Sequence, residues 1–246
     1  RDPETIGRIR TWAPDIIIVA AYGKIIPQEI IDVPPHGILN VHTSLLPRHR
    51  GASPIQYAVL SGDQEAGATI MRIDAGLDTG PIVSQRFIAI AQDETTETLM
   101  RKLAVLGADL LVETLPQWFE GTITPRPQKS ADATLTKIFK KKDGEVSVEH
   151  TTEQIERMIR AFTPWPGVFM TLHDKKGKQK ILKLISARIM PCIPTLPPLS
   201  FSLIDTPNGK KDLLLHTKNS CLILDSVQPE GKKPMTGHAF YVGYKK

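Results

Sequence analysis

The sequence predicts an α/β protein in which a mostly parallel sheet is followed by a smaller β-rich domain. Three observations support this fold class. Short apolar runs alternate with helical patterns up to residue 121, the chain then changes character, and short apolar runs broken by glycine and proline follow. Strands separated by helices favour a parallel sheet. Short strands between regular turn signals favour a small β barrel or sandwich.

Helix and strand patterns alternate in the first half of the chain. The apolar run at residues 16–20 is typical of a strand buried on both faces. Ser53 and Pro54 are the residue types preferred at an N-cap and at the first position of a helix. The expected elements are a helix at 4–12, strands at 16–20 and 37–42, a helix at 54–60, strands at 68–73 and 82–90, and a leucine-striped helix at 95–119.

The second half begins with a proline-bearing stretch of little periodicity at 122–142, which reads as a linker. We expect a first domain at 1–121 and a second domain at 143–246 on either side of it. The elements expected in the second domain are a helix at 152–161, strands at 167–172, 180–189, 213–216 and 221–224, and an irregular proline-rich loop at 193–207.

Composition bounds the class of protein. The chain has 246 residues, of which 41% are hydrophobic and 23% charged, values that suit two globular domains and do not favour a disordered chain. No run of about 18 apolar residues occurs, so no membrane span is expected. The first residues, Arg1 to Glu4, contain neither an initiator methionine nor an apolar secretory core, and we expect the true N-terminus to be missing.

The number of cysteines and the distribution of charge indicate the compartment and the possible partners. The two cysteines, Cys192 and Cys221, lack the spacing of metal ligands and are too few to suggest a disulfide framework. This cysteine usage favours a reducing cytoplasm. Residues 1–121 contain 10 Lys and Arg against 15 Asp and Glu, a net charge of −5, whereas residues 122–246 contain 21 against 11, a net charge of +10. The basic half either contacts a polyanion or is a solvated lysine-rich surface.

Asn40 and His42 are the first candidates for chemistry. Their spacing of two places both side chains on one face of the expected strand, near its end, where α/β sheets bind ligands. An amide can donate to an oxyanion and an imidazole can exchange protons near neutral pH, which suits acyl transfer. The alternative interpretation is a local hydrogen-bond arrangement at a strand end.

Asp78 is the third candidate. It lies in a turn between Gly76 and Gly80, where the backbone can approach a ligand closely. A carboxylate there could orient His42 or raise its basicity, as the acid of a catalytic triad does. Alternatively, Asp78 stabilises its own turn.

Considered together, these segments resemble the folate-dependent formyltransferases. The runs at 40–48 (Asn-Val-His-Thr-Ser-Leu-Leu-Pro-Arg) and 50–56 (Arg-Gly-Ala-Ser-Pro-Ile-Gln) are similar to the signature of that family, and 76–80 is similar to its second signature. The resemblance implies a Rossmann-like formyltransferase fold with its first elements missing, 10-formyltetrahydrofolate as the formyl donor, and no metal. It further implies catalytic roles for Asn40, His42 and Asp78, and a tetrahydrofolate site lined by Ser44, Leu45, Leu46, Pro47, Tyr22 and Gly23.

The second half resembles the C-terminal domain of the methionyl-tRNA formyltransferase family at 159–167 and 228–235. The resemblance implies an OB-like β barrel and methionyl-initiator tRNA as the formyl acceptor. It also gives the basic half a polyanionic partner. Trp165 is expected to be a packed aromatic rather than a base-stacking one. The lysines that could contact tRNA are Lys140, Lys141, Lys142, Lys175, Lys176, Lys178, Lys210 and Lys211.

The sequence departs from the family pattern at one position, and three other functions are also considered. Residue 49 is histidine where many family members carry tryptophan, and little effect on the chemistry is expected. The rivals are a formyltransferase for another amine such as an amino sugar nucleotide, a hydrolase that releases formate from the folate, and a non-catalytic tRNA-binding remnant. A monomer acting in the cytoplasm is expected in the main interpretation.

Overall fold

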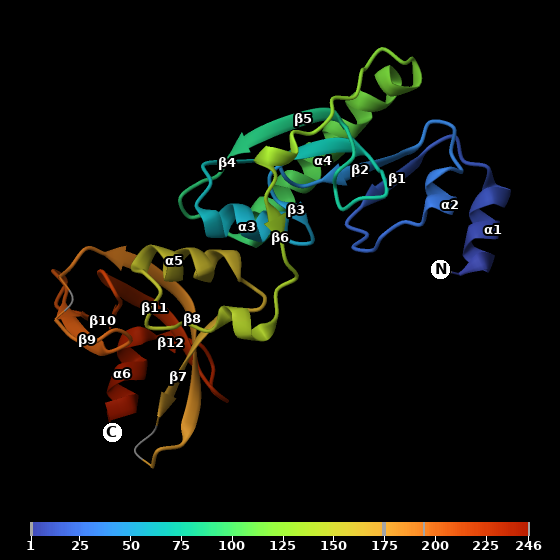
Figure 1. The fold of residues 1–246 in the computed structure, drawn as a ribbon. Coiled ribbons are helices and arrows are strands. Elements are labelled where there is room, and N and C mark those ends of the chain that lie inside the picture. Colours follow the sequence, from blue (N-terminus) through green and yellow to red (C-terminus); the bar gives the residue numbers. More distant parts are fainter. Residues whose placement is uncertain (1, 174–175, 194, 246) are drawn as a thin grey trace. The chain divides into compact units, whose positions relative to one another are not determined.

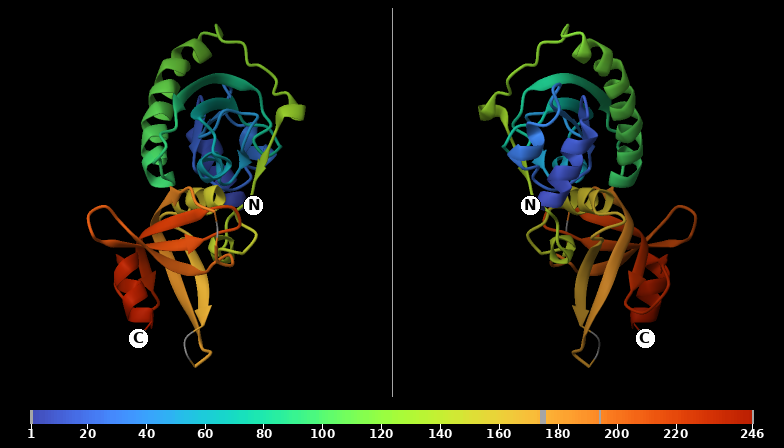
Figure 2. Two further views of the ribbon diagram at one scale, coloured as in Figure 1. Left: turned by 90° about the vertical axis from the view of Figure 1, so that its left-hand side faces the viewer. Right: turned by 90° about the vertical axis from the view of Figure 1, so that its right-hand side faces the viewer.

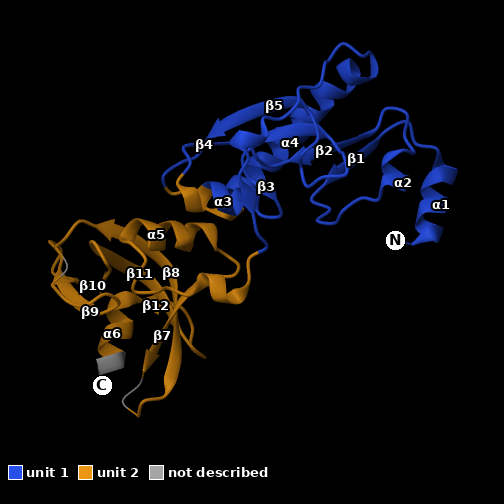
Figure 3. Cartoon of the chain, in the orientation of Figure 1, with its two compact units in different colours: residues 1–58, 63–92, 98–138 blue, residues 59–62, 93–97, 139–246 orange. Residues whose placement is uncertain are grey.

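The computed structural model describes residues 2–173, 176–193 and 195–245, and the chain divides into two compact units (Figure 1). Unit 1 comprises residues 1–58, 63–92 and 98–138, and unit 2 comprises 59–62, 93–97 and 139–246 (Figure 3). Lys175, one of the lysines predicted to contact tRNA, lies outside the described residues. None of the helices in the described part of the chain is long and apolar enough to cross a membrane.

Unit 1 contains a four-stranded mixed sheet with the strand order β1-β2-β4-β5. Its strands are β1 (Ile17–Ala20), β2 (Ile38–His42), β4 (Glu65–Arg72) and β5 (Ile82–Ala89). Only β1 and β2 are parallel, whereas β4 is antiparallel to both β2 and β5. The prediction of a mostly parallel sheet was therefore wrong for the described residues, although the four strands lie where they were expected.

Strand β1 lies at one edge of this sheet, and only alternate residues of it are half-buried. The expectation of a strand buried on both faces was wrong here, because an apolar run reports composition and not the number of covered faces. The neighbouring strand β2 fits that description better, since Ile38 and Leu39 are completely buried.

Helices α1 (Pro3–Trp12), α2 (Gln28–Ile31), α3 (Pro54–Ser61) and α4 (Thr96–Phe119) complete this part of the chain. Asp2 caps α1 by accepting from the main-chain nitrogens of Glu4 and Thr5. The long helix α4 runs along the sheet of unit 1 (Figure 2), where its Leu110 joins Leu39 and Ile70 in the core. Gly107 permits this approach, since a Cβ there would lie 2.7 Å from Val41.

The segment after α4 returns to unit 1 and pairs with it. Strand β6 (Leu135–Thr136) is parallel to the short strand β3 (Arg50–Gly51), and the 3-10 helix η1 (Ser130–Asp132) precedes β6. The main chain of Arg126 also exchanges two hydrogen bonds of 2.8 Å with Ile82 at the start of β5. Residues 126–136 were predicted as part of a linker. They instead form main-chain hydrogen bonds with β3 and with the start of β5, and we call them the returning segment.

Unit 2 is an antiparallel sheet with the order β7-β8-β11-β10-β9, to which β12 adds beside β11. No pairing of β7 with β9 closes this sheet among the described residues, so a closed barrel is not confirmed. The proline-rich loop expected at 193–207 contains β9, so that expectation was wrong for these residues. The elements are η2 (Lys141–Gly144), α5 (Thr152–Ala161), β7 (Val168–His173), β8 (Gln179–Met190), β9 (Phe201–Asp205), β10 (Lys211–His216), β11 (Cys221–Pro229), β12 (Met235–Thr236) and α6 (Gly237–Lys245).

Helix α5 has the bounds that the sequence predicted. Thr151 and Gln154 form a capping box at its N-terminus, which satisfies main-chain donors of the first turn. Ile155 and Met158 recur at helical spacing and are buried in unit 2. The capping signal and the apolar stripe therefore predict the same helix.

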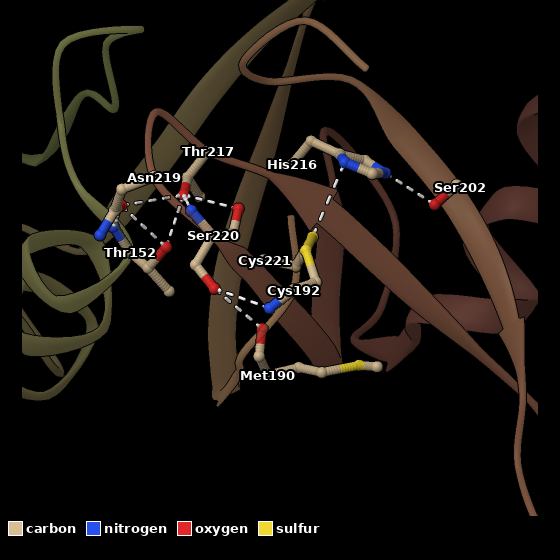
Figure 4. Close-up of a disulfide and its surroundings, with 9 residues drawn as sticks. All are labelled: Thr152, Met190, Cys192, Ser202, His216, Thr217, Asn219, Ser220 and Cys221. Atoms are coloured by element: carbon tan, nitrogen blue, oxygen red, sulfur yellow. Dashed lines mark hydrogen bonds between the residues drawn. A yellow bond between two sulfur atoms is a disulfide. The ribbon is translucent and has the colours of Figure 1, made fainter. Parts of the chain in front are cut away.

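A disulfide joins Cys192 to Cys221 within unit 2 (Figure 4). Cys221 is opposite Met190 in the β8–β11 ladder. Cys192 follows Met190 by two residues, and its Cα atom lies 5.8 Å from that of Cys221. Ser220 Oγ donates to the Met190 carbonyl and accepts from the Cys192 nitrogen, each at 3.1 Å. Two cysteines are too few to suggest a disulfide framework, and this bond was not predicted, because their proximity arises from strand register and not from spacing in the sequence.

Replacing Cys192 by serine is expected to lower the free energy of unfolding of unit 2. The bridge spans 29 residues, and closing a loop of that length in the unfolded chain is worth about 3.5 kcal/mol. Denaturant unfolding without reductant would measure the difference, and the wild-type protein in reductant serves as the matched control. An unchanged unfolding midpoint in the variant would contradict a stabilising bridge.

Candidate active site

Asn40 and His42 lie on one face of β2, as their spacing predicted. Asn40 is half-buried, and no hydrogen bond of its side-chain amide is found within the described residues. His42, the last residue of β2, is 6% exposed. An amide without an internal partner beside a buried imidazole leaves one strong donor available to a bound molecule.

Asp78 approaches His42 from the loop between β4 and β5. Its Oδ2 accepts from the main-chain nitrogen of Gly51 at 2.7 Å and lies 3.7 Å from His42 Nδ1. The turn itself is stabilised by Asp74, whose Oδ1 accepts from Gly76 and from Thr79 Oγ1. The hydrogen bond found for the Asp78 carboxylate in the described residues is thus with Gly51 and not with its own turn.

Asp78 has a left-handed backbone, with φ of 51°. A non-glycine residue in this region is uncommon, although Asp tolerates it better than most. Such conformations cost on the order of 1–3 kcal/mol and persist where surrounding contacts hold them. The hydrogen bond from Gly51 is one such contact.

The tautomer of His42 follows from its neighbours. Nε2 lies 3.0 Å from the main-chain carbonyl of His49, which can only accept, so Nε2 carries the hydrogen. In the neutral ring, Nδ1 is then unprotonated and faces the Asp78 carboxylate. Burial holds the pKa of the His42 imidazole below its usual value of about 6.5, and the negative charge of Asp78 offsets part of that shift. Nδ1 can accept a proton while Asp78 stabilises the resulting cation.

The lowered pKa of His42 gives a pH prediction with a definite sign. If the neutral imidazole acts as the base, the acid limb of kcat/KM lies below pH 6.5, the usual value for histidine. Asp78→Asn removes a charge that raises this pKa, so the limb is expected to move to lower pH still. A pH profile of kcat/KM for both proteins measures this. An acid limb above pH 6.5 in the wild type, or an upward shift in Asp78→Asn, would contradict the assignment.

The segment predicted to line the folate site is held firmly by its neighbours. Ser44 and Leu46 are both buried, and Ser44 Oγ donates to the Arg48 carbonyl at 2.7 Å. Thr69 Oγ1 donates to the Ser44 carbonyl and accepts from the Leu46 nitrogen. These contacts fix the main chain that follows His42, with Leu45 and Pro47 half-buried on either side of Leu46.

Tyr22 and Gly23 follow β1 in the sequence. Because β1 and β2 are parallel and Ala20 is level with Val41, both strands end at the same edge of the sheet. Tyr22 is 58% exposed there, and Gly23 has φ of 66°, a left-handed turn that suits glycine. The structure thus brings this turn to the edge at which His42 lies.

Several groups near His42 and Asp78 were missed in the sequence. They are the carbonyl of His49, the nitrogen of Gly51, and the side chains of Arg50 and Gln128. Main-chain groups leave no residue-type signal, and Gln128 lies in a segment that was read as a linker. Within the described residues, no group of three or more His, Cys, Asp or Glu is arranged to hold a metal ion.

Comparison with known proteins gives a family for each half of the chain. Residues 1–115 match the family described as formyl transferase, and residues 138–245 match the formyl transferase C-terminal domain. The methionyl-tRNA formyltransferase of Roseiflexus castenholzii is 41% identical over 235 residues, which cover 96% of this chain and 72% of that protein. The methionyl-tRNA formyltransferase of Desulfotalea psychrophila is 40% identical over 251 residues, covering 100% of this chain and 73% of that protein.

Solved structures give the same result at the level of the fold. HypX from Aquifex aeolicus, in a complex with tetrahydrofolic acid, is similar with a TM-score of 0.67 and 17% identity, over 98% of this chain and 41% of that one. A sugar N-formyltransferase from Shewanella is similar with a TM-score of 0.60 and 18% identity, over 73% and 72% of the two chains. At these identities the likeness concerns the fold alone.

Proposed function

Since the chain belongs to the formyl transferase family, and within it to the methionyl-tRNA formyltransferases, we propose that it transfers a formyl group to the α-amine of methionyl-initiator tRNA. The formyl donor is 10-formyltetrahydrofolate. The observation that carries this function is the identity of about 40% over almost the whole chain to enzymes of that name. The product primes translation initiation.

The geometry of the site suggests how each residue acts on the two substrates. The Asn40 amide, which has no internal partner in the described residues, donates to the oxyanion that forms when the amine attacks the formyl carbon. His42 Nδ1 takes the proton that the attacking nitrogen must lose, directly or through a water. The oxyanion then collapses, the bond from the formyl carbon to N10 of the folate breaks, and N10 takes up a proton as tetrahydrofolate leaves. Asp78, at 3.7 Å, stabilises the protonated ring. The low pKa of His42 keeps the ring neutral, and so able to accept, near pH 7.

The tRNA partner is consistent with the charge of the second half of the chain. Residues 122–246 carry a net charge of +10, and cations that neutralise phosphates release counterions on binding. Trp165 is 55% exposed, so the expectation of a packed aromatic was wrong, and the ring is available to stack on a base. Lys211, one of the proposed lysine contacts, pairs with Asp205 at 3.4 Å and would have to leave this carboxylate to meet a phosphate.

We further propose that the sheet of unit 2 is OB-like, that the protein acts as a monomer, and that translation initiation places it in the cytoplasm. The disulfide is a feature that reducing conditions would open, so the cytoplasmic protein has to tolerate its loss. Sedimentation of the protein with and without reductant tests both the monomer and this tolerance.

The test of the function is a formylation assay with the intact protein and 10-formyltetrahydrofolate. Methionyl-initiator tRNA, uncharged initiator tRNA and an amino sugar nucleotide are supplied in parallel, and formyl product and free formate are both measured. Formylmethionyl-tRNA formed only with the charged tRNA is the expected result. Formate release without tRNA would favour a hydrolase, formylated sugar another acceptor, and tRNA binding without any product a non-catalytic protein.

A further inference from the structure

The side-chain amide of Gln128 joins two segments of unit 1 that are far apart in the sequence. Its Nε2 donates to the main-chain carbonyl of Asp78 at 2.9 Å and to that of Gly80 at 2.7 Å. An amide nitrogen has two hydrogens, so both are used on the loop that carries Asp78. The loop is thus held by a residue 50 positions later in the chain.

The oxygen of the same amide faces Arg50. Gln128 Oε1 accepts from Arg50 Nε at 3.0 Å and from Arg50 Nη2 at 2.8 Å. Arg50 is 6% exposed, so its charge depends on buried hydrogen bonds, and Gln128 supplies the two that are recorded for the guanidinium in the described residues. All four hydrogen-bonding positions of the Gln128 amide are occupied, which defines its orientation.

These contacts form a closed ring through the candidate site. From Gln128 the ring passes to Arg50, along the chain to Gly51, and from the Gly51 nitrogen to Asp78 Oδ2. It returns from the Asp78 carbonyl to Gln128. The carboxylate and the main chain of Asp78 are therefore both fixed, although the left-handed backbone of this residue is not one that it would hold unaided.

Gly51 leaves little room for adjustment in the ring. Its φ is 106°, and a Cβ at this position would lie 2.7 Å from the carbonyl oxygen of Thr136 in strand β6. Strand β6 and Gln128 belong to the same returning segment. This segment holds Gly51, which donates to the Asp78 carboxylate, through β6, and it holds the Asp78 loop through Gln128. Any displacement of Gln128 would be passed to the carboxylate that faces His42.

We propose that Gln128 is a positioning residue for formyl transfer, which holds the Asp78 carboxylate against His42 by bridging the Asp78 loop to Arg50. This inference rests on the proposed function. The segment predicted as a linker would then complete the active site, and Gln128 would act through Asp78 and touch neither substrate.

The test uses Gln128→Met in the intact protein, which keeps the length of the side chain and removes its hydrogen bonds. The expected result is a fall in kcat of about 10–100-fold, since a displacement of 1 Å can cost about 10²-fold, with KM for both substrates within about threefold. The matched control is Gln117→Met, which removes only one exposed hydrogen bond within α4 and should leave kcat unchanged.

A second measurement needs no activity. NMR titration of His42 in the wild type, Gln128→Met and Asp78→Asn should place the pKa of His42 in Gln128→Met below that of the wild type and toward that of Asp78→Asn, because Asp78 raises this pKa. An unchanged His42 pKa would overturn the proposal whether or not kcat falls. An unchanged kcat beside a working wild type would also overturn it.

A further variant covers the case in which Gln128→Met does not fold. Gln128→Glu keeps an acceptor oxygen for the two hydrogen bonds from Arg50 and replaces the NH2 group that donates to the Asp78 loop. It should therefore fold, with its carboxylate paired to the buried guanidinium, and still lose kcat by at least about tenfold. Wild-type turnover in folded Gln128→Glu would overturn the proposal. If the wild type itself formylates no tRNA, the proposed function fails, whereas the His42 titration still decides the role of Gln128.

Discussion

Replacing His42 by alanine is expected to lower kcat for formyl transfer by about 10²–10⁴-fold, the usual contribution of a positioned acid–base group. The reason is geometric. His42 Nδ1 is the unprotonated ring nitrogen that faces Asp78, because Nε2 donates to the His49 carbonyl. Steady-state kinetics with methionyl-initiator tRNA would measure the loss.

The matched control for this variant is His36→Ala. His36 is also in unit 1 but precedes β2, and its ring contacts Phe119 instead of Asp78. Its replacement should leave kcat within a few-fold of the wild type. If His42→Ala and His36→Ala turn over at similar rates while circular dichroism shows both to be folded, His42 is not the base.

The second large effect is expected for Asn40→Ala. Removing one oxyanion donor typically lowers kcat by about 10²–10³-fold, and the amide of Asn40 has no hydrogen bond within the described structure that would be broken. Stability should therefore change little, and the loss should be in kcat and not in KM. Asn208→Ala, in an exposed turn of unit 2, is the control. A rise in KM with an unchanged kcat would instead make Asn40 a ground-state binding residue.

Most of the longer elements of this protein could be predicted from its sequence, but the directions of the strands could not. Helix α5 has its predicted bounds because a capping box and an apolar stripe agree locally. Strands β4 and β5 were found as apolar runs, yet they turned out antiparallel to their neighbours. An apolar run has the same pattern whichever way the strand points. The loop between β4 and β5 was also not recognised as the connection of a β-hairpin.

The residues proposed for the candidate site could be predicted from the sequence, but the hydrogen bonds that hold them in place could not. Asn40 and His42 share a face because strand geometry has a period of two. The ring through Gln128 had no comparable signal. It combines a side-chain contact between residues 50 and 128 with a hydrogen bond from Gln128 to the main chain of a third segment. The disulfide was missed for the same reason, since the ladder of β8 and β11 sets the distance between its sulfur atoms.

The pairing of β6 with β3 has a practical consequence for dissecting the chain. A shortened protein ended at residue 121, where the sequence changes character, would lose Gln128 and the strand that flanks Gly51. It would be expected to fold poorly or to hold Asp78 loosely, and its inactivity could be mistaken for a need for the basic half. A truncation after residue 138 keeps the returning segment, and only such a version can tell whether the first half transfers formyl groups by itself.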